Sequence, residues 1–146
     1  MFQRQRLTFF AVSVVALAST GACSYVAKAQ AEAGVDKFHQ QMNDVKFDDI
    51  WNGADDAFRQ EALRIAGSKR PYDATMVQLR HKLGRVVTSS TQKWSVKTID
   101  SLSTVMLVQD TRFERGSAVE NFTFLVRGGV AKLRDYEFTS PQFAIQ

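Results

Sequence analysis

The pair Gly128-Gly129 separates two stretches, SAVENFTFLVR and VAKLRDYEFTS, that are rich in β-branched and aromatic residues. Both glycines tolerate the positive φ angles of a two-residue turn, so the pattern predicts a β-hairpin. Arg115-Gly116 separates STVMLVQDTRFE from SAVENFTFLVR in the same way, and RVVTSSTQKWSVKTI supplies a further strand with a bend near Ser90. The second half of the chain is therefore predicted to form a four-stranded antiparallel meander.

The first half of the chain shows helical periodicity instead. Apolar residues recur at spacings of three and four between Val26 and Asn43, which predicts a helix with one buried stripe. A short helix is expected at Phe47–Trp51, and a third at Asp55–Ala66 that buries Phe58, Ala62 and Ile65 and stops at Gly67. A fourth helix, N-capped by Asp73, should end at Gly84. Helices followed by strands indicate a single α+β domain.

The two turns also predict a register. A loop at Gly128-Gly129 pairs Arg127 with Val130, and a turn at Arg115-Gly116 pairs Glu114 with Ser117. One face then carries residues suited to packing on helices: Val105, Leu107, Phe113, Phe122, Phe124, Val126 and Leu133. The opposite face carries Met106, Val108, Val119, Leu125 and Phe138. A sheet that is apolar on both faces needs a second cover, and a partner subunit is the simplest one, which predicts a homodimer through the sheet.

The N-terminus has the layout of an export signal. Arg4 and Arg6 precede the apolar run Leu7–Ala18, and the small residues STGA follow it. Twelve apolar residues are too few to span about 30 Å of hydrocarbon as a helix. We therefore expect residues 1–22 to be a signal peptide, with 1–29 as an alternative, 23–34 to form a tether and the start of the first helix, and 35–146 to form the domain. The product is expected in the periplasm or cell envelope.

The single cysteine, Cys23, follows this leader directly. The sequence TGAC resembles the lipobox of bacterial lipoproteins, whose cysteine is acylated, although Thr20 stands where that pattern prefers Leu. Cleavage after Ala29 would discard Cys23, and ordinary cleavage after Ala22 would leave it as a free thiol. Acylation explains an unpaired exported cysteine, so we expect Cys23 to attach the chain to membrane lipid.

Three further stretches, FHQQMN, HKLGRVVTSS and DTRFERGSAVENF, resemble uncharacterised bacterial exported proteins and lipoproteins of the nuclear-transport-factor-2-like (NTF2-like) form of the cystatin-like superfold. The resemblance spans roughly residues 35–140. It implies a cone-shaped α+β fold in which a curved meander follows the helices, and frequent homodimerisation through the sheet. It implies no particular activity, because this superfold hosts enzymes, adaptors and immunity proteins alike.

Motifs of nucleophilic, phosphate-binding or zinc enzymes are absent from the sequence. Under the predicted register Asp110, Asn121 and Tyr136 lie side by side on three strands, a set suited either to proton transfer or to a structural hydrogen-bond ladder. The ladder is the simpler interpretation. A second polar set should share the face of Phe122, as a pocket mouth or a solvated sheet end: Gln109, Glu120, Asp135 and Glu137.

Metal and nucleic-acid binding are not expected. His39 and His81 lie on different predicted helices without spaced partner ligands, so His39 is interpreted as a partly exposed helix residue and His81 as part of a solvated face. The formal charge of +4 falls to +2 without Arg4 and Arg6, and no basic stripe with interleaved aromatics is present.

The sequence thus favours a non-catalytic, membrane-tethered binding or interaction module of the cell envelope. It would have no cofactor and would bind a small-molecule or protein ligand that the sequence does not identify. The alternative is a small NTF2-like lyase or isomerase with an acid–base pocket on the sheet, for which Asp110, Asn121 and Tyr136 are the candidate catalytic residues.

Overall fold

The computed structural model describes residues 20–144 and has the predicted α+β architecture. Four helices come first: α1 (Thr20–Asn43), α2 (Phe47–Gly53), α3 (Asp56–Ala66) and α4 (Arg70–Leu83). Four strands follow: β1 (Val86–Ile99), β2 (Leu102–Phe113), β3 (Gly116–Arg127) and β4 (Val130–Thr139), before a last short helix, α5 (Pro141–Ala144). The strands form one antiparallel meander in the order β1-β2-β3-β4, as the turn signals predict.

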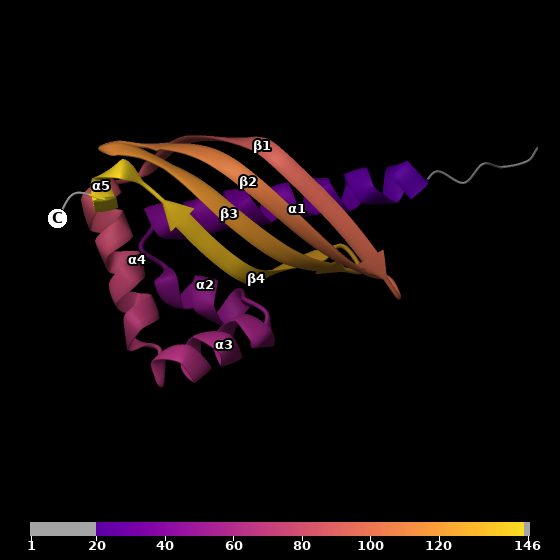
Figure 1. The fold of residues 1–146 in the computed structure, drawn as a ribbon, viewed down its shortest axis with the longest axis horizontal. Coiled ribbons are helices and arrows are strands. Elements are labelled where there is room, and N and C mark those ends of the chain that lie inside the picture. Colours follow the sequence, from indigo (N-terminus) through magenta and orange to yellow (C-terminus); the bar gives the residue numbers. More distant parts are fainter. Residues whose placement is uncertain (1–19, 145–146) are drawn as a thin grey trace, which may run out of the picture.

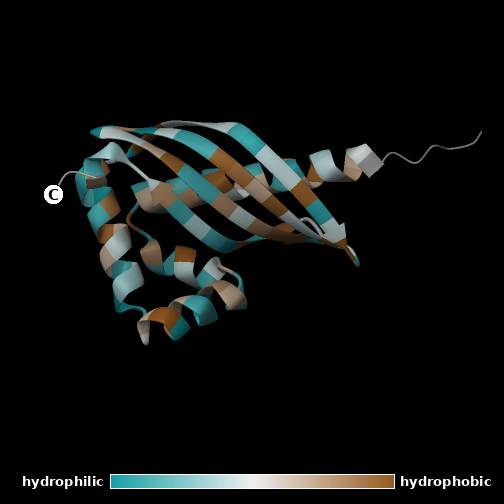
Figure 2. Ribbon diagram, viewed as in Figure 1, coloured by the Kyte–Doolittle hydropathy of each residue, from teal (hydrophilic) through white to brown (hydrophobic). Residues whose placement is uncertain are grey.

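The long helix α1 lies across one face of the sheet and contacts all four strands (Figure 1). We call this face the inner face and the opposite one the outer face. Hydrophobic and hydrophilic residues alternate along the strands, as expected when only one face packs on helices (Figure 2). The inner face buries every apolar residue assigned to it from the sequence: Val105, Leu107, Phe113, Phe122, Phe124, Val126 and Leu133.

Aromatic rings fill the space between α1 and the sheet. The ring of Phe38 on α1 lies 5.1 Å from that of Phe122 and 4.6 Å from that of Tyr136, centroid to centroid. Gly34 lets α1 approach closely, because a Cβ atom there would lie 2.7 Å from the Phe124 ring. Helices α2 and α3 lie beside β4, and the Asp55 amide between them donates a hydrogen bond of 2.8 Å to the Leu133 carbonyl. Part of the β4 edge is therefore covered, while β1 is the other edge of the sheet.

The helices differ from the prediction in two boundaries and in the burial of one residue. Helix α1 is already formed at Thr20 rather than at Val26, and Ala27 is buried in the core. Helix α4 starts at Arg70, so Pro71 lies in its first turn, where its missing N–H costs little, and Asp73 is not the N-cap. Ile65 was expected to be buried in α3 but is 70% exposed.

Two differences in the sheet affect the register. The turn between β2 and β3 is Glu114-Arg115, so Leu107 pairs with Phe122 rather than with Phe124. Because this shift is by two residues, every side chain keeps its face. Pairing of β3 with β4 follows the prediction from Arg127–Val130 to Phe124–Leu133, after which a bulge breaks the register. The bulge moves the end of β4 by one residue, so Phe138, expected on the outer face, packs against the core.

The β1–β2 turn gives a test of backbone strain. Asp100 and Ser101 have φ angles of 48° and 64°, the left-handed conformation of a two-residue hairpin turn, which glycine adopts more easily than serine. We expect Ser101→Gly to raise the free energy of unfolding by about 0.5–1 kcal/mol in urea titration. The matched change Gly129→Ala, at φ 81°, should lower it by about 1 kcal/mol. Equal stability of Ser101→Gly and the native chain would contradict strain at this turn.

Candidate functional site

A buried carboxylate, Glu120, lies at the centre of the contact between α1 and the sheet. Its side chain is only 1% exposed. Alternation along β3 explains its position, since Ala118, Glu120 and Phe122 all face inward. Burying a charged or polar group without partners costs several kcal/mol, so the surroundings must supply hydrogen bonds.

Three side chains supply them. His39 Nε2 lies 2.7 Å from Glu120 Oε2, the Thr111 hydroxyl donates to the same oxygen at 2.5 Å, and the Tyr136 hydroxyl donates to Oε1 at 2.7 Å. An ionised carboxylate can only accept, so in that state His39 Nε2 carries the proton that it donates. The partners come from α1, β2 and β4, and Glu120 therefore joins three elements that are distant in sequence.

The position of His39 corrects the expectation that it is partly exposed. It is 6% exposed, because it follows Val35 by one helical turn and so joins the buried stripe of α1. Its pairing with Glu120 was not predicted from the sequence. The signals for this pair were the four-residue spacing from Val35 and the in-phase position of Glu120 between Ala118 and Phe122. His81 is exposed, as expected.

Polar side chains continue from Glu120 toward the N-terminal half of α1. Ser89 contacts the Thr111 hydroxyl at 3.1 Å and donates to Gln109 Oε1 at 3.0 Å. Gln109 donates to Thr91 at 2.7 Å, which in turn donates to Glu32 at 2.7 Å. We call this chain, from His39 and Glu120 to Glu32, the inner polar network. Partial burial opposes ionisation of Glu32, but hydrogen bonds from Lys28 and Thr91 prevail and lower its pKa.

Tyr136 is held in its neutral form. Burial raises the pKa of its hydroxyl well above the ordinary value of 10, and the neighbouring Glu120 adds to this shift. Burial likewise raises the pKa of Tyr72, whose hydroxyl donates to the Phe47 carbonyl at 3.1 Å. Both phenols act as hydrogen-bond donors up to strongly alkaline pH.

The predicted row of Asp110, Asn121 and Tyr136 does not form. Asp110 and Asn121 are exposed on the outer face, where Asp110 pairs with Val119 and Asn121 with Glu137. The β4 bulge places Tyr136 opposite Phe122 on the inner face, away from the other two.

The second polar set is also divided between the faces. Gln109 and Glu120 are buried on the inner face beside Phe122, as expected, but they belong to a hydrogen-bonded core rather than to a pocket mouth. Asp135 and Glu137 are exposed, because the bulge turns them to the outer face.

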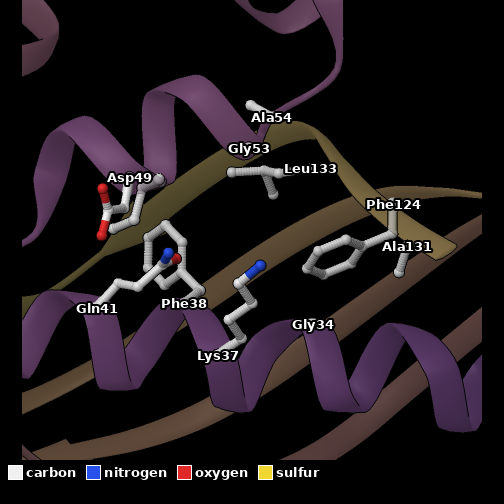
Figure 3. A pocket seen from close by; sticks show the side chains of 11 residues that line it. Gly34, Lys37, Phe38, Gln41, Asp49, Gly53, Ala54, Phe124, Ala131 and Leu133 are labelled. Atoms are coloured by element: carbon white, nitrogen blue, oxygen red, sulfur yellow. The ribbon is translucent and has the colours of Figure 1, made fainter.

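A small cleft and two open hollows lie around the sheet. A cleft between α1, α2 and β4 has a volume of about 50 Å³, and Lys37 and Gln41 of α1 lie along it (Figure 3). That volume holds one or two waters. A larger open groove of about 480 Å³ runs between α1 and β1 and is lined by His39 and Ser89 among others. Asp110 lines a separate open hollow of about 700 Å³, together with Arg112 and Thr139.

Residues 20–144 contain neither a metal-binding cluster nor a membrane-spanning helix. No cluster of histidine, cysteine and carboxylate side chains in this range could hold a metal ion. None of the helices in the same range is both long and apolar enough to cross a bilayer. The predicted leader lies outside the described residues, but Cys23 lies within them and is exposed in the first turns of α1.

Comparisons with known proteins give no family. No protein-family model, no curated protein and no solved structure matches this chain.

Removing the Tyr136 hydroxyl tests how much its hydrogen bond to Glu120 contributes to the free energy of unfolding. Tyr136→Phe keeps the ring in the core but leaves Glu120 Oε1 without its partner, which should cost about 1–3 kcal/mol of unfolding free energy at pH 7. Because the folded pKa of Tyr136 is raised, its ionisation in the unfolded state lowers native stability as pH rises above about 10. Urea titrations at pH 7 and above pH 10 should show a smaller alkaline loss in the variant.

A matched control is Tyr25→Phe, which removes a hydroxyl from an exposed tyrosine and should leave both measurements unchanged. If Tyr136→Phe had the same free energy of unfolding as the native chain at pH 7, the role of this hydroxyl would be contradicted. The alkaline loss should persist in part, because Tyr72 retains its own raised pKa.

Proposed function

We propose that this chain is a non-catalytic protein of the cell envelope, held at a membrane through Cys23 and acting as a binding or interaction module. The observation that carries the proposal is the occupied space between α1 and the sheet. Phe38, Phe122 and Tyr136 fill that space, and both oxygens of Glu120 are engaged within the protein. A substrate would have to displace the core to reach this carboxylate.

The alternative, a lyase or isomerase, has less support. An acid–base pocket needs its groups to converge on one free space. Asp110 and Asn121 lie on one face of the sheet, and Tyr136 lies on the other. The Tyr136 hydroxyl also donates a hydrogen bond to Glu120. Its raised pKa keeps it protonated at neutral pH, so it cannot act as a base there.

Contacts of the first turns of α1 support cleavage before Cys23. Ala27 is 4% exposed in the core, and Lys28 pairs with Glu32 at 2.7 Å while lying over the Trp94 ring at 5.6 Å. Cleavage after Ala29 would remove all of these contacts. Cleavage before Cys23 keeps them and leaves the cysteine exposed, where it is accessible for acylation.

We also propose that a second copy covers the outer face of the sheet. Met106 and Val119 are 56% and 42% exposed on that face, and Val108 and Leu125 are half-buried. Charge favours a second copy of this chain as the occupant. Lys93, Val108, Asn121 and Glu137 lie in one row across the sheet, so the row is basic at the β1 edge and acidic at the β4 edge.

A two-fold axis parallel to the strands brings β1 of one copy over β4 of the other. Lys93 then faces Glu137 of the second copy, with Val108 near the axis between them. The neighbouring row runs from Ser95 through Met106 to Asp135 and adds a further acid at the β4 edge. Aligned packing of this kind is the usual geometry of two sheets.

Acylation is tested by intact mass spectrometry of the protein purified from bacterial membranes. We expect an N-terminus at Cys23 with the added mass of acyl chains, since two or more chains are needed for stable anchoring. Cys23→Ser should lose that mass and the incorporation of a labelled fatty acid. A mature N-terminus at Gln30 would end the lipoprotein proposal.

Dimerisation is tested by light scattering after size-exclusion chromatography. The native chain should have the mass of two copies, and Met106→Lys, which places a charge in the centre of the outer face, should have the mass of one. Val77→Lys is the matched control, because Val77 is 53% exposed on α4, away from the sheet's outer face. A native chain that is monomeric at micromolar concentration would overturn the dimer.

A further inference from the structure

Three segments distant in sequence meet at one end of the molecule. In an antiparallel meander the β1–β2 turn (Asp100-Ser101) and the β3–β4 turn (Gly128-Gly129) lie at the same end of the sheet. The first turns of α1 lie at this end too, because a Cβ atom on Gly129 would be 3.5 Å from the Gln30 side chain. Figure 1 shows all three on the right. We call this region, residues 20–30, 94–102 and 127–132, the hairpin end.

The hairpin end gathers exposed apolar side chains. They are Tyr25 (65% exposed), Val26 (57%), Trp94 (39%), Ile99 (59%) and Val130 (58%). Among residues 20–144, the aromatic members of the exposed large hydrophobic side chains are Tyr25 and Trp94, and both are here. Their rings lie 5.4 Å apart, so they form one exposed aromatic cluster that joins α1 to β1.

Basic residues surround these apolar groups. Lys97, Arg127 and Lys132 are exposed near the ends of the strands. Arg127 and Lys132 line a hollow with Leu102, Leu125, Val130 and the acid Asp55, whose carboxylate accepts a hydrogen bond from the Ala57 amide. Lys28 lies over the Trp94 ring. The acid within the turns is Asp100, and the carboxylate of Glu32 is already hydrogen-bonded to Lys28 and Thr91. The hairpin end is thus apolar at its tips and basic around them.

This combination fits a lipid surface. Tryptophan and tyrosine prefer the membrane–water interface, where their rings are apolar and their polar atoms stay hydrated. Lysine and arginine next to an anionic bilayer each contribute roughly 1 kcal/mol of attraction. Cys23 lies in the first turns of α1, so the proposed acylation of this residue brings lipid to this end.

We propose that the hairpin end rests on the surface of an anionic bilayer, with Trp94, Tyr25, Ile99 and Val130 in the interfacial layer. This inference rests on the proposed membrane attachment and adds an orientation to it. The strands then run from the membrane toward the aqueous side, where the β2–β3 turn and α5 lie. The domain is therefore docked through its own surface and is not held by its N-terminal residues alone.

Tryptophan fluorescence of the full chain tests this orientation. The chain has two tryptophans, and Trp51 is buried at 8% exposure, so Trp51→Phe leaves Trp94 as the reporter. On vesicles that contain anionic phosphatidylglycerol and lipids brominated near the headgroup, we expect Trp94 emission to shift to the blue and fall roughly twofold. If Trp51→Phe disturbs the fold, the difference between the native chain and Trp94→Phe reports the same quantity.

The matched control carries its tryptophan elsewhere on the surface. Val77→Trp in a chain with both native tryptophans changed to phenylalanine places the reporter on α4, and we expect no quenching there. Ile99→Asp with Val130→Asp should abolish quenching of Trp94 while the chain still floats with the vesicles. That pattern separates docking from attachment.

Other outcomes would overturn the docking of the hairpin end, the attachment of the chain to the membrane, or both. Flotation of the native chain with no more quenching at Trp94 than at position 77 overturns docking and leaves attachment standing. Absence of flotation overturns both. Equal quenching on neutral phosphatidylcholine vesicles overturns the requirement for an anionic surface.

Discussion

The hydrogen bonds to Glu120 constrain the rest of the structure. A carboxylate that is 1% exposed must be satisfied within the protein, and its partners come from α1, β2 and β4. These bonds fix where α1 crosses the sheet, because His39 must reach β3 while Phe38 beside it packs on Phe122 and Tyr136. They also require the β4 bulge, since only the shifted register turns Tyr136 inward. One buried polar group thus specifies the alignment of three elements, which apolar packing alone would leave less defined.

The same arrangement explains why the inner face is a poor place for chemistry. Buried acid–base groups in enzymes face a space that a substrate can enter, and they keep a lone pair or proton directed into it. Here Glu120 directs both of its oxygens at protein partners, and Phe38, Phe122 and Tyr136 pack together on the same face of the sheet. His39 and Ser89 do line an open groove between α1 and β1, but both are hydrogen-bonded to the inner polar network. The geometry is that of a polar core.

Sequence patterns predicted the architecture because the signals were local. Turn glycines, alternation and helical spacing identified the meander, the helices and seven buried apolar residues of the inner face. The register between β2 and β3 was wrong by two residues, an error that keeps every face and therefore did no harm to the core assignment. The β4 bulge had no such local signal. Arg134, the unpaired residue of the bulge, is of an ordinary residue type, and the reason for the bulge is a long-range contact, the hydrogen bond from Tyr136 to Glu120. For that reason Asp110, Asn121 and Tyr136 do not lie side by side as predicted, and the pair His39–Glu120, joined across 81 positions, was not predicted.

The proposed dimer and the proposed membrane orientation constrain each other through symmetry. The two outer-face rows that end at Glu137 and Asp135 favour a two-fold axis parallel to the strands, because that axis sets Lys93 at the β1 edge of one copy over Glu137 at the β4 edge of the other. A rotation about this axis leaves the direction of each strand unchanged, so the hairpin ends of both copies point the same way. Both exposed aromatic clusters and both Cys23 residues then face one membrane, and the attachment of two chains adds to that of one. A two-fold axis in the sheet plane but perpendicular to the strands would place one hairpin end far from the bilayer. Membrane docking and face-to-face pairing are therefore compatible only in the arrangement that the surface charges favour.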